Sequence, residues 1–171
     1  SNKISAQYCY CDAHDASIVS NCCQNGGAED TIAPDRTGHG THITGILASK
    51  NSTYKGVSNG AQIFVVKVLN STGGGFLDDI GKAIDWCVVN QSVDVISISI
   101  SDYENYPGVS TCPTDIDAKI NNAYANDVPI MAAAGNKGYI NGTSYPACSP
   151  NATSVGMTYD KTISLGYTIW P

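Results

Sequence analysis

Two histidines, His39 and His42, stand three residues apart at the start of a segment with helical periodicity. Apolar residues follow at Ile43, Ile46 and Leu47, and this spacing predicts a helix with one apolar face that begins at His39. Glycine flanks His39 on both sides, which lets the backbone turn sharply and lets another chain pass close to the imidazole. This arrangement suits a histidine that contacts a substrate.

Two other interpretations of this segment involve no catalysis. The segment could be an ordinary polar helix N-terminus, capped by Thr41 and carrying two incidental histidines. The histidines could also bind a metal ion, because residues three apart share one face of a helix. No carboxylate in that turn completes a metal site, so the sequence predicts none there.

The composition describes a compact, loop-rich protein of one domain. Of the 171 residues, 14% are charged and 17 are glycine, and the formal net charge is −6. Because no cluster of Lys and Arg is present to neutralise phosphates, we expect no nucleic-acid partner. No apolar run reaches the ~18 residues of a membrane-spanning helix, so we expect no membrane span.

Cysteine usage indicates an oxidising compartment. The chain has seven cysteines, more than is usual for a cytosolic protein that binds no metal. Five Asn-x-Ser/Thr sequences add weaker support for export. We therefore expect a secreted or cell-surface protein.

The four N-terminal cysteines allow two interpretations, a small metal site that includes His14 or a loop held by disulfides. Adjacent cysteines point in different directions and rarely chelate one ion together, which favours disulfides. We expect two bridges among Cys9, Cys11, Cys22 and Cys23, with the pairing left open.

Strands and helices alternate along the rest of the chain. Residues 62–69 form an apolar run of strand length, as expected for a parallel strand covered on both faces. Further strands are predicted at 93–101, at 128–133 and near 153, and helices at 77–90 and 114–126. This alternation predicts an α/β three-layer sandwich with a mainly parallel sheet and functional groups at the C-terminal ends of the strands.

On each of these two helices, four residues are predicted to point inward. On the helix 77–90 they are Ile80, Ala83, Ile84 and Cys87. On the helix 114–126 they are Ile116, Ile120, Ala123 and Tyr124.

The segment from Gly38 to Gly45 reads GHGTHITG, and it resembles the active-site histidine motif of the subtilisin-like serine peptidases. Thr44 departs from that motif, where a small Ala is usual. The resemblance covers residues 38–160, so we expect residues 1–171 to form a partial catalytic domain of that fold, incomplete at both ends. Residues 1–37 show little periodicity and resemble a Cys-rich insertion of exported members.

The resemblance also implies roles for other residues. Gly73, Gly74 and Gly75 match an edge that pairs with the backbone of the substrate, a form of strand addition. Ser99, Ile100 and Ser101 match the segment on the other side of the substrate, and Ser101 replaces a usual Gly in a way that would narrow the primary specificity pocket or alter its backbone. His39 would be the catalytic base, and Asn136 would donate to the oxyanion.

Members of the family with similar sequences carry a matched pair of cysteines at the positions of Cys112 and Cys148. The resemblance therefore implies a disulfide between them. Cys87 is left as the odd cysteine, which we expect to be a buried free thiol on a helix.

Two members of the expected catalytic triad have no match in the sequence. In the family the aspartate ends an apolar strand and is followed by Ser or Thr and then Gly, which excludes Asp12, Asp15, Asp30 and Asp35. Ser144 occurs in Gly-Thr-Ser, but Pro146 follows it and prevents the helix that the family's nucleophile requires.

The function that this implies is a fragment of a serine endopeptidase acting on peptides or proteins, inactive as an isolated chain. A non-catalytic pseudo-peptidase that binds peptides is the alternative, followed by a structural cell-surface domain. No cofactor is certain: calcium is possible, but residues 49–55 are short for the usual calcium loop and offer only Asn51 as an evident ligand.

We predict no strand within residues 1–37, so the family's aspartate-bearing strand has no counterpart in this sequence. A gap at that place would leave buried backbone groups unpaired, at ~1–3 kcal/mol each. We therefore expect a second polypeptide segment or a second copy to supply the missing strand.

Overall fold

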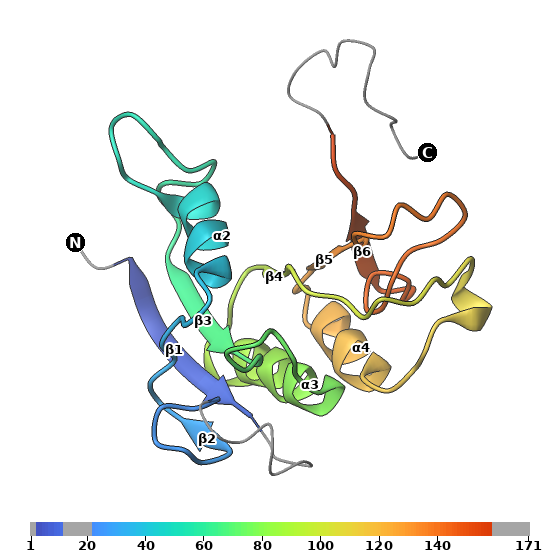
Figure 1. Ribbon diagram of the computed structural model, residues 1–171, viewed down its shortest axis with the longest axis horizontal. Helices are drawn as coiled ribbons and strands as arrows, with labels where there is room; N and C mark the ends of the chain where they lie inside the picture. The colour runs from blue at the N-terminus through green and yellow to red at the C-terminus, as the bar shows by residue number, and fades with distance from the viewer. Residues whose placement is uncertain (1–2, 12–21, 159–171) are drawn as a thin grey trace. The chain divides into compact units, whose positions relative to one another are not determined.

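A computed structural model describes residues 3–11 and 22–158 of the chain. The chain divides into two compact units, Ser1–Val93 and Asp94–Pro171. Figure 1 shows the strands and helices of both units. No helix within the described residues has the length and apolar character needed to cross a bilayer.

The first unit holds a three-stranded sheet of order β2-β1-β3. Strand β1 runs antiparallel to β2 and parallel to β3. Helix α3 contacts β1 and continues directly into a π-helical turn. The elements of this unit are β1 (Ile4–Tyr10), β2 (Glu29–Asp30), α2 (His39–Ala48), β3 (Ile63–Lys67), α3 (Leu77–Asp85) and the π-helical Trp86–Asn90.

Strand β1 corrects the prediction that residues 1–37 contain no strand. It pairs with β3 from Ile4 opposite Ile63 to Cys9 opposite Lys67, with one irregularity between Ile4 and Ala6. The β3 strand therefore has a parallel neighbour within its own chain. A second segment or copy is therefore not required to pair with β3.

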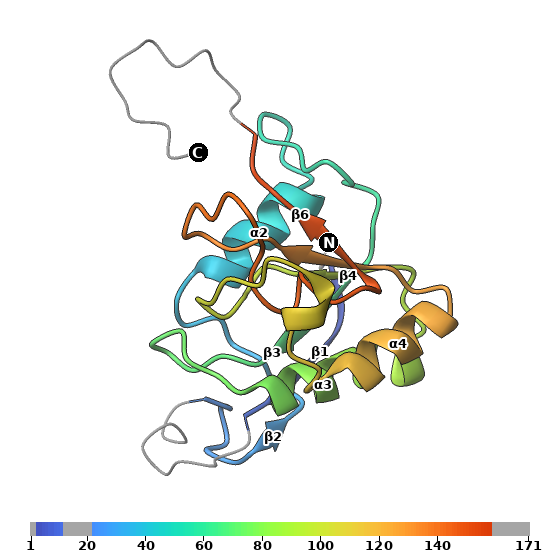
Figure 2. The ribbon, with the colours of Figure 1, turned by 90° about the vertical axis from the view of Figure 1, so that its right-hand side faces the viewer.

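The second unit holds a wholly parallel sheet of order β4-β5-β6. Figure 2 shows this sheet, and helix α4 lies against its central strand β5. The elements of this unit are β4 (Ile96–Ile98), a 3₁₀ turn (Val109–Thr111), α4 (Asp117–Ala125), β5 (Ile130–Ala133) and β6 (Ala152–Val155). With the β1–β3 pair, this sheet confirms the predicted α/β fold with mainly parallel pairing.

Helix α4 buries three of the four residues predicted to point inward. Ile116, at its N-terminal boundary, Ile120 and Ala123 are almost fully buried. Tyr124 is 64% exposed, so its predicted inward position is wrong. The buried stripe follows i, i+4 and i+7 only, and it is too narrow to include the next residue.

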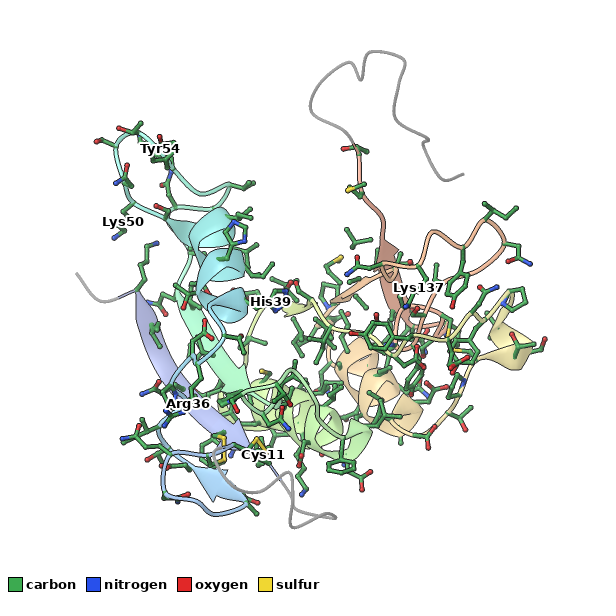
Figure 3. All side chains as sticks on the ribbon, viewed as in Figure 1. Cys11, Arg36, His39, Lys50, Tyr54 and Lys137 are labelled. Atoms are coloured by element: carbon green, nitrogen blue, oxygen red, sulfur yellow. A yellow bond between two sulfur atoms is a disulfide. The ribbon has the colours of Figure 1, made fainter. Side chains whose placement is uncertain are left out.

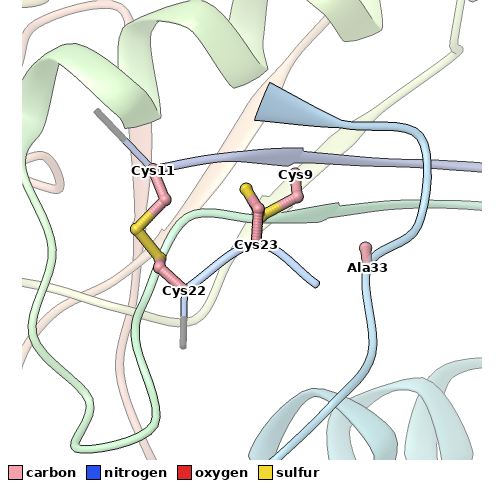
Figure 4. Close-up of a cluster of buried hydrophobic side chains, with 5 residues drawn as sticks. All are labelled: Cys9, Cys11, Cys22, Cys23 and Ala33. Atoms are coloured by element: carbon pink, nitrogen blue, oxygen red, sulfur yellow. A yellow bond between two sulfur atoms is a disulfide. The ribbon is translucent and has the colours of Figure 1, made fainter. Parts of the chain in front are cut away.

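Three disulfides hold the chain, and they agree with the expected bridges. Cys9 pairs with Cys23 and Cys11 with Cys22, so the second bridge lies inside the loop closed by the first (Figure 4). These four cysteines are buried together with Ala33 and form a small core at the end of β1. In the second unit Cys112 pairs with Cys148.

The seventh cysteine is free, as expected. Cys87 lies in the π-helical turn that follows α3, and its side chain is buried. Burial raises the pKa of the thiol to about 11, because the thiolate would lose its hydration. This environment gives a thiol of low reactivity near neutral pH.

Candidate functional site

His39 is the first residue of α2, as the periodicity predicts, and its side chain is exposed (Figure 3). The residue before the helix is Gly38, whose backbone is left-handed with φ 85°. Glycine adopts this conformation without steric cost, so the chain can turn sharply into the helix at this point. The carbonyl of Gly38 accepts the first helical bond from the N–H of His42 at 2.9 Å.

Gly38 has no side chain to cap the helix, and a carboxylate from Asp35 takes that place. Its Oδ1 accepts hydrogen bonds from the N–H of Thr37 at 3.0 Å and of Gly38 at 2.8 Å. Its Oδ2 accepts from the N–H and the hydroxyl of Thr41 at 2.8 and 2.7 Å. These bonds, the Thr41 hydroxyl first, hold the pKa of Asp35 well below its usual range.

Sequence reasoning treated Asp35 only as a possible triad carboxylate and rejected it. Its bonds to the first turn of α2 are consistent with that rejection, because they give the carboxylate another partner set. A signal for this role was available, since Asp just before a helix is a typical cap. The cap position itself is Gly38, so Asp35 stands three residues earlier than the usual pattern.

The glycine-rich loop of the first unit is a tight turn organised by Asn70. The side-chain oxygen of Asn70 accepts from Thr72 N–H and Gly74 N–H, each at 2.9 Å. The backbone N–H of Asn70 donates to the carbonyl of Gly74 at 2.8 Å. The N–H of Gly73 donates to the carbonyl of Asn70 at 3.2 Å, so the N–H of Gly73 and both backbone groups of Gly74 are engaged within the loop.

In the second unit the two predicted segments follow neighbouring parallel strands. Ser99–Ser101 comes directly after β4, and Asn136 comes three residues after β5. Since β4 pairs with β5, these segments leave the same edge of the sheet. Asn136 is exposed there.

Gly135 marks the closest approach at this edge. A Cβ atom at this position would lie 2.5 Å from Ser144 Oγ and 3.8 Å from Ser101 Oγ, and the residue has φ 105°. Both the space and the backbone conformation therefore require glycine before Asn136. The side chain of Ser101 is thus close to the segment that carries Asn136.

Ser144 is fully buried and is hydrogen-bonded to one residue near each of these segments. Its N–H donates to the carbonyl of Ala134 at 2.9 Å, and its hydroxyl donates to the carbonyl of Glu104 at 2.9 Å. Both polar groups are committed to backbone partners, in contrast to an exposed nucleophile. This geometry gives Ser144 a structural role.

Asp102 was not singled out by sequence reasoning, although it follows the Ser99–Ser101 segment. Its Oδ1 accepts from the N–H of Tyr145 at 3.0 Å, and its own N–H donates to the carbonyl of Tyr145 at 3.1 Å. Its Oδ2 accepts from the hydroxyl of Tyr106 at 2.9 Å. Burial and this bond raise the pKa of Tyr106 to about 12.

The other predicted positions have simple outcomes. His39 and Gly73–Gly75 belong to the first unit, while Ser99–Ser101 and Asn136 belong to the second. Asp12, His14 and Asp15 lie outside the described residues. The four N-terminal thiols are oxidised to disulfides, which excludes the alternative of a metal site built on them, and no three His, Cys, Asp or Glu side chains within residues 3–11 and 22–158 gather as metal ligands.

Comparison with known proteins identifies the family of this arrangement. Residues 3–164 match the family model described as the subtilase family, Peptidase S8. The chain is a subtilase. The match includes β1 as well as the segments that carry His39 and Asn136.

Two bacterial subtilases show how much of a whole protein is represented. The chain is 33% identical over 129 residues to the minor extracellular protease Epr of Bacillus subtilis, covering 74% of the chain and 19% of that protein. It is 35% identical over 127 residues to subtilisin E of the same species, covering 71% of the chain and 31% of that protein. The chain thus spans less than a third of the length of either relative.

A solved structure of proteases from Pseudoalteromonas arctica PAMC 21717 shares the fold. It superimposes with a TM-score of 0.72 at 23% identity, covering 89% of this chain and 50% of that one. A cold-adapted subtilisin-like serine proteinase gives a TM-score of 0.64 at 28% identity, covering 76% of this chain and 44% of that one. Both confirm the predicted subtilisin-like fold.

Proposed function

We propose that this chain is the central part of a serine endopeptidase, with His39 as the general base and Asn136 as an oxyanion donor. His39 would take the proton of a serine hydroxyl and return it to the leaving amine. The side chain of Asn136 would donate a hydrogen bond to the oxygen that becomes negative in the tetrahedral intermediate. The match to the subtilase family across both segments carries the proposal.

The nucleophilic serine would come from sequence outside these 171 residues. The motif Gly-Thr-Ser-Met-Ala-x-Pro does not occur in the chain, and Ser144 is buried with its hydroxyl bonded to Glu104. The relatives are more than three times as long as the matched segment. As an isolated polypeptide the chain would therefore not cleave peptides.

The source of the triad carboxylate needs a separate test. Ala13 follows Asp12, where the family has Ser or Thr. Strand β1, which is parallel to β3, ends at Tyr10, and Asp12 follows two residues later in the sequence. Asp12 itself lies outside the described residues, and we propose that the chain holds no triad aspartate.

A peptide substrate would pair with backbone groups of the glycine-rich loop and of the Ser99–Ser101 segment. Because both backbone groups of Gly74 and the N–H of Gly73 are bonded to Asn70, Gly75 and the carbonyl of Gly73 would provide the pairing edge in the first unit. Ser99–Ser101 would provide a second pairing segment, with the side chain of Ser101 restricting the primary pocket near Gly135. Replacing Ser101→Gly is then expected to raise the rate for bulky side chains relative to small ones.

Secretion fits the same proposal. The three disulfides are typical of proteins that fold in an oxidising compartment. One relative is named an extracellular protease.

The experiment uses a fluorophosphonate probe and a chromogenic peptide on two proteins, the 171-residue chain and the longer polypeptide that continues to the serine motif. We expect labelling and hydrolysis only in the longer protein, because loss of the serine costs about 10⁶ in kcat in a subtilisin. In the longer protein, His39→Ala should remove nearly all activity, and Asn136→Ala should lower kcat by about 10²–10³.

Labelling of Ser144 in the isolated chain would contradict the proposal. A longer protein that binds peptide, carries the serine motif and still cuts nothing would favour the alternative of a non-catalytic peptide-binding subtilase. Asp12→Asn in the longer protein decides whether that residue is the triad carboxylate.

A further inference from the structure

The Asp35 carboxylate divides its two oxygens between the two sides of His39. Oδ1 accepts from the backbone of Thr37 and Gly38, which precede the histidine, and also from the Thr37 hydroxyl at 3.4 Å. Oδ2 accepts from the backbone and hydroxyl of Thr41, which follows it. One side chain thus spans the backbone from 37 to 41, with His39 at the centre of the span.

Apart from Asp35, one long side-chain bond holds the start of α2, from the N–H of His39 to the Thr37 hydroxyl at 3.4 Å. The N-cap residue is Gly38, no acidic residue stands in the first turn, and no side chain of the cap residue bonds to the helix. Gly40 and Gly45 within the helix lower its intrinsic stability further. Helix ends fray, and His39, as the first helical residue, would be the first to lose its position.

We propose that Asp35 is the positioning residue of His39, and that its carboxylate fixes the backbone on both sides of the histidine so that the imidazole projects in one direction. This proposal rests on the proposed role of His39 as the general base. The role differs from that of a triad carboxylate, because Asp35 acts through the backbone of Gly38 and Thr41. Asp35 therefore positions the base and touches no reacting atom.

The charge of Asp35 is maintained by its surroundings. The hydrogen bonds from Thr41, Gly38 and Thr37 favour the ionised form and lower the pKa of the carboxyl. Burial lowers the pKa of Lys67, at the end of β3, and the nearby charge of Asp35 raises the pKa of this lysine by a smaller amount. The Asp35 carboxylate is accordingly ionised, and able to accept these hydrogen bonds, at every pH at which a histidine base is neutral.

The substitution Asp35→Asn tests this positioning role with almost no change in the shape of the side chain. An amide has one acceptor oxygen and one NH₂ group. On one side of His39 the NH₂ group would therefore face backbone N–H donors and could accept no hydrogen bond from them. Asp30→Asn is the matched control, because Asp30 also accepts two backbone bonds in the first unit, from Asn25 and Ile32. Thr41→Val is a milder variant, since it deletes only the hydroxyl bond to Oδ2.

The first measurement uses NMR on the 171-residue chain. In the unmodified protein we expect the Hα–Hβ couplings of His39 to show one side-chain rotamer, and the amides of Gly38 and Thr41 to be protected from exchange. Asp35→Asn should average the His39 couplings and lower protection of both amides by at least about tenfold, the effect of losing a bond to a charged group. Asp30→Asn should change neither.

Unchanged His39 couplings in Asp35→Asn would overturn the proposal. If that variant does not fold, Thr41→Val decides the question. Partial averaging of the His39 couplings would support the positioning role of Asp35, and a spectrum like that of the unmodified chain would refute it.

The second measurement is kinetic and uses the longer protein. Asp35→Asn should lower kcat by about 100-fold, the loss expected from a small misplacement of a catalytic group, with KM within about twofold. Asp30→Asn should retain both constants. A fall in kcat no larger than that of Asp30→Asn would refute the positioning role. Full activity of His39→Ala would instead refute the proposed function, and the NMR comparison would still decide what Asp35 does to His39.

Discussion

Replacing Tyr145→Phe removes one hydroxyl group from the interior of the second unit. Tyr145 is fully buried, and its hydroxyl accepts a bond from the N–H of Ile116 at 3.0 Å. The same hydroxyl donates to Asp117 Oδ1 at 3.3 Å. Phe fits the same space, so the change isolates the contribution of these two bonds.

The two bonds are lost with different consequences. Asp117 Oδ1 keeps a bond from the hydroxyl of Ser149 at 2.8 Å, so it remains satisfied. The N–H of Ile116 loses its partner in a residue that is only 2% exposed. An unpaired buried N–H costs about 1–3 kcal/mol, and we expect Tyr145→Phe to lower the free energy of unfolding by about 2 kcal/mol. For a unit of this size the midpoint temperature should fall by roughly 10 °C.

Tyr124→Phe provides the control, because Tyr124 is 64% exposed on α4 in the same unit. That change should alter the free energy of unfolding by less than about 0.5 kcal/mol. Urea denaturation followed by circular dichroism measures both variants, and hydrogen exchange of the Ile116 amide reports the lost bond directly. Equal stability of the two variants, with the Ile116 amide still protected, would refute the reasoning.

Three further predictions follow from the cysteines and tyrosines. Replacing both Cys112 and Cys148 by serine should destabilise the second unit by about 4 kcal/mol, because this bridge closes a loop over a sequence separation of 36; a loss below about 1 kcal/mol in urea denaturation would contradict the loop-closure argument. The Cys87 thiol, with its pKa raised to about 11, should resist Ellman's reagent at pH 8 and react as one equivalent in guanidinium; rapid reaction of the native protein would show that the helix opens there. The pKa of Tyr106 is raised from 10.0 to about 12, and the unfolded chain therefore loses this proton at a lower pH than the folded protein does. The contribution of Tyr106 to the free energy of unfolding is complete below pH 10 and is lost as pH rises toward 12. Tyr106→Phe should reduce this loss of stability at alkaline pH, and an unchanged loss would assign it to other groups.

Local pattern was sufficient to locate the elements with strong periodicity. The helix that begins at His39 was predicted to the residue, and the run around Ile63–Lys67 forms β3. Their apolar spacing is a property of the segment itself, so neighbours need not be known. The motifs around His39 and Asn136 are likewise contiguous in sequence, and each lies at the end of a predicted element.

Strand β1 could not be found in this way. Its sequence ISAQYCY alternates weakly and includes polar residues, and its burial is only partial. It is a strand because β3 pairs with it in parallel and because Cys9 is bonded to Cys23, contacts that join distant parts of the chain. Strand pairing of this kind depends on context more than on the residues of the strand.

The roles of Asp35 and Asp102 were missed for a related reason. Both lie in loops, and both act through backbone groups whose positions are set by the fold. A carboxylate in a loop is ordinarily a solvated turn residue. An Asp shortly before a helix is a local signal that could have indicated Asp35, whereas only the placement of Tyr145 in a distant segment gives Asp102 its backbone partners.

The nested bridges at the end of β1 also determine what happens when the chain is cut. Cys9–Cys23 and Cys11–Cys22 link the chain on either side of residues 12–21. A peptide bond hydrolysed between Asp12 and Asn21 therefore leaves both products joined by two covalent links. The nicked protein would migrate as one species until reductant is added, and strand β1 would remain attached to the polypeptide that carries His39. A single cut in this segment would thus go undetected in size-based assays without reductant, and the protein would keep its strand.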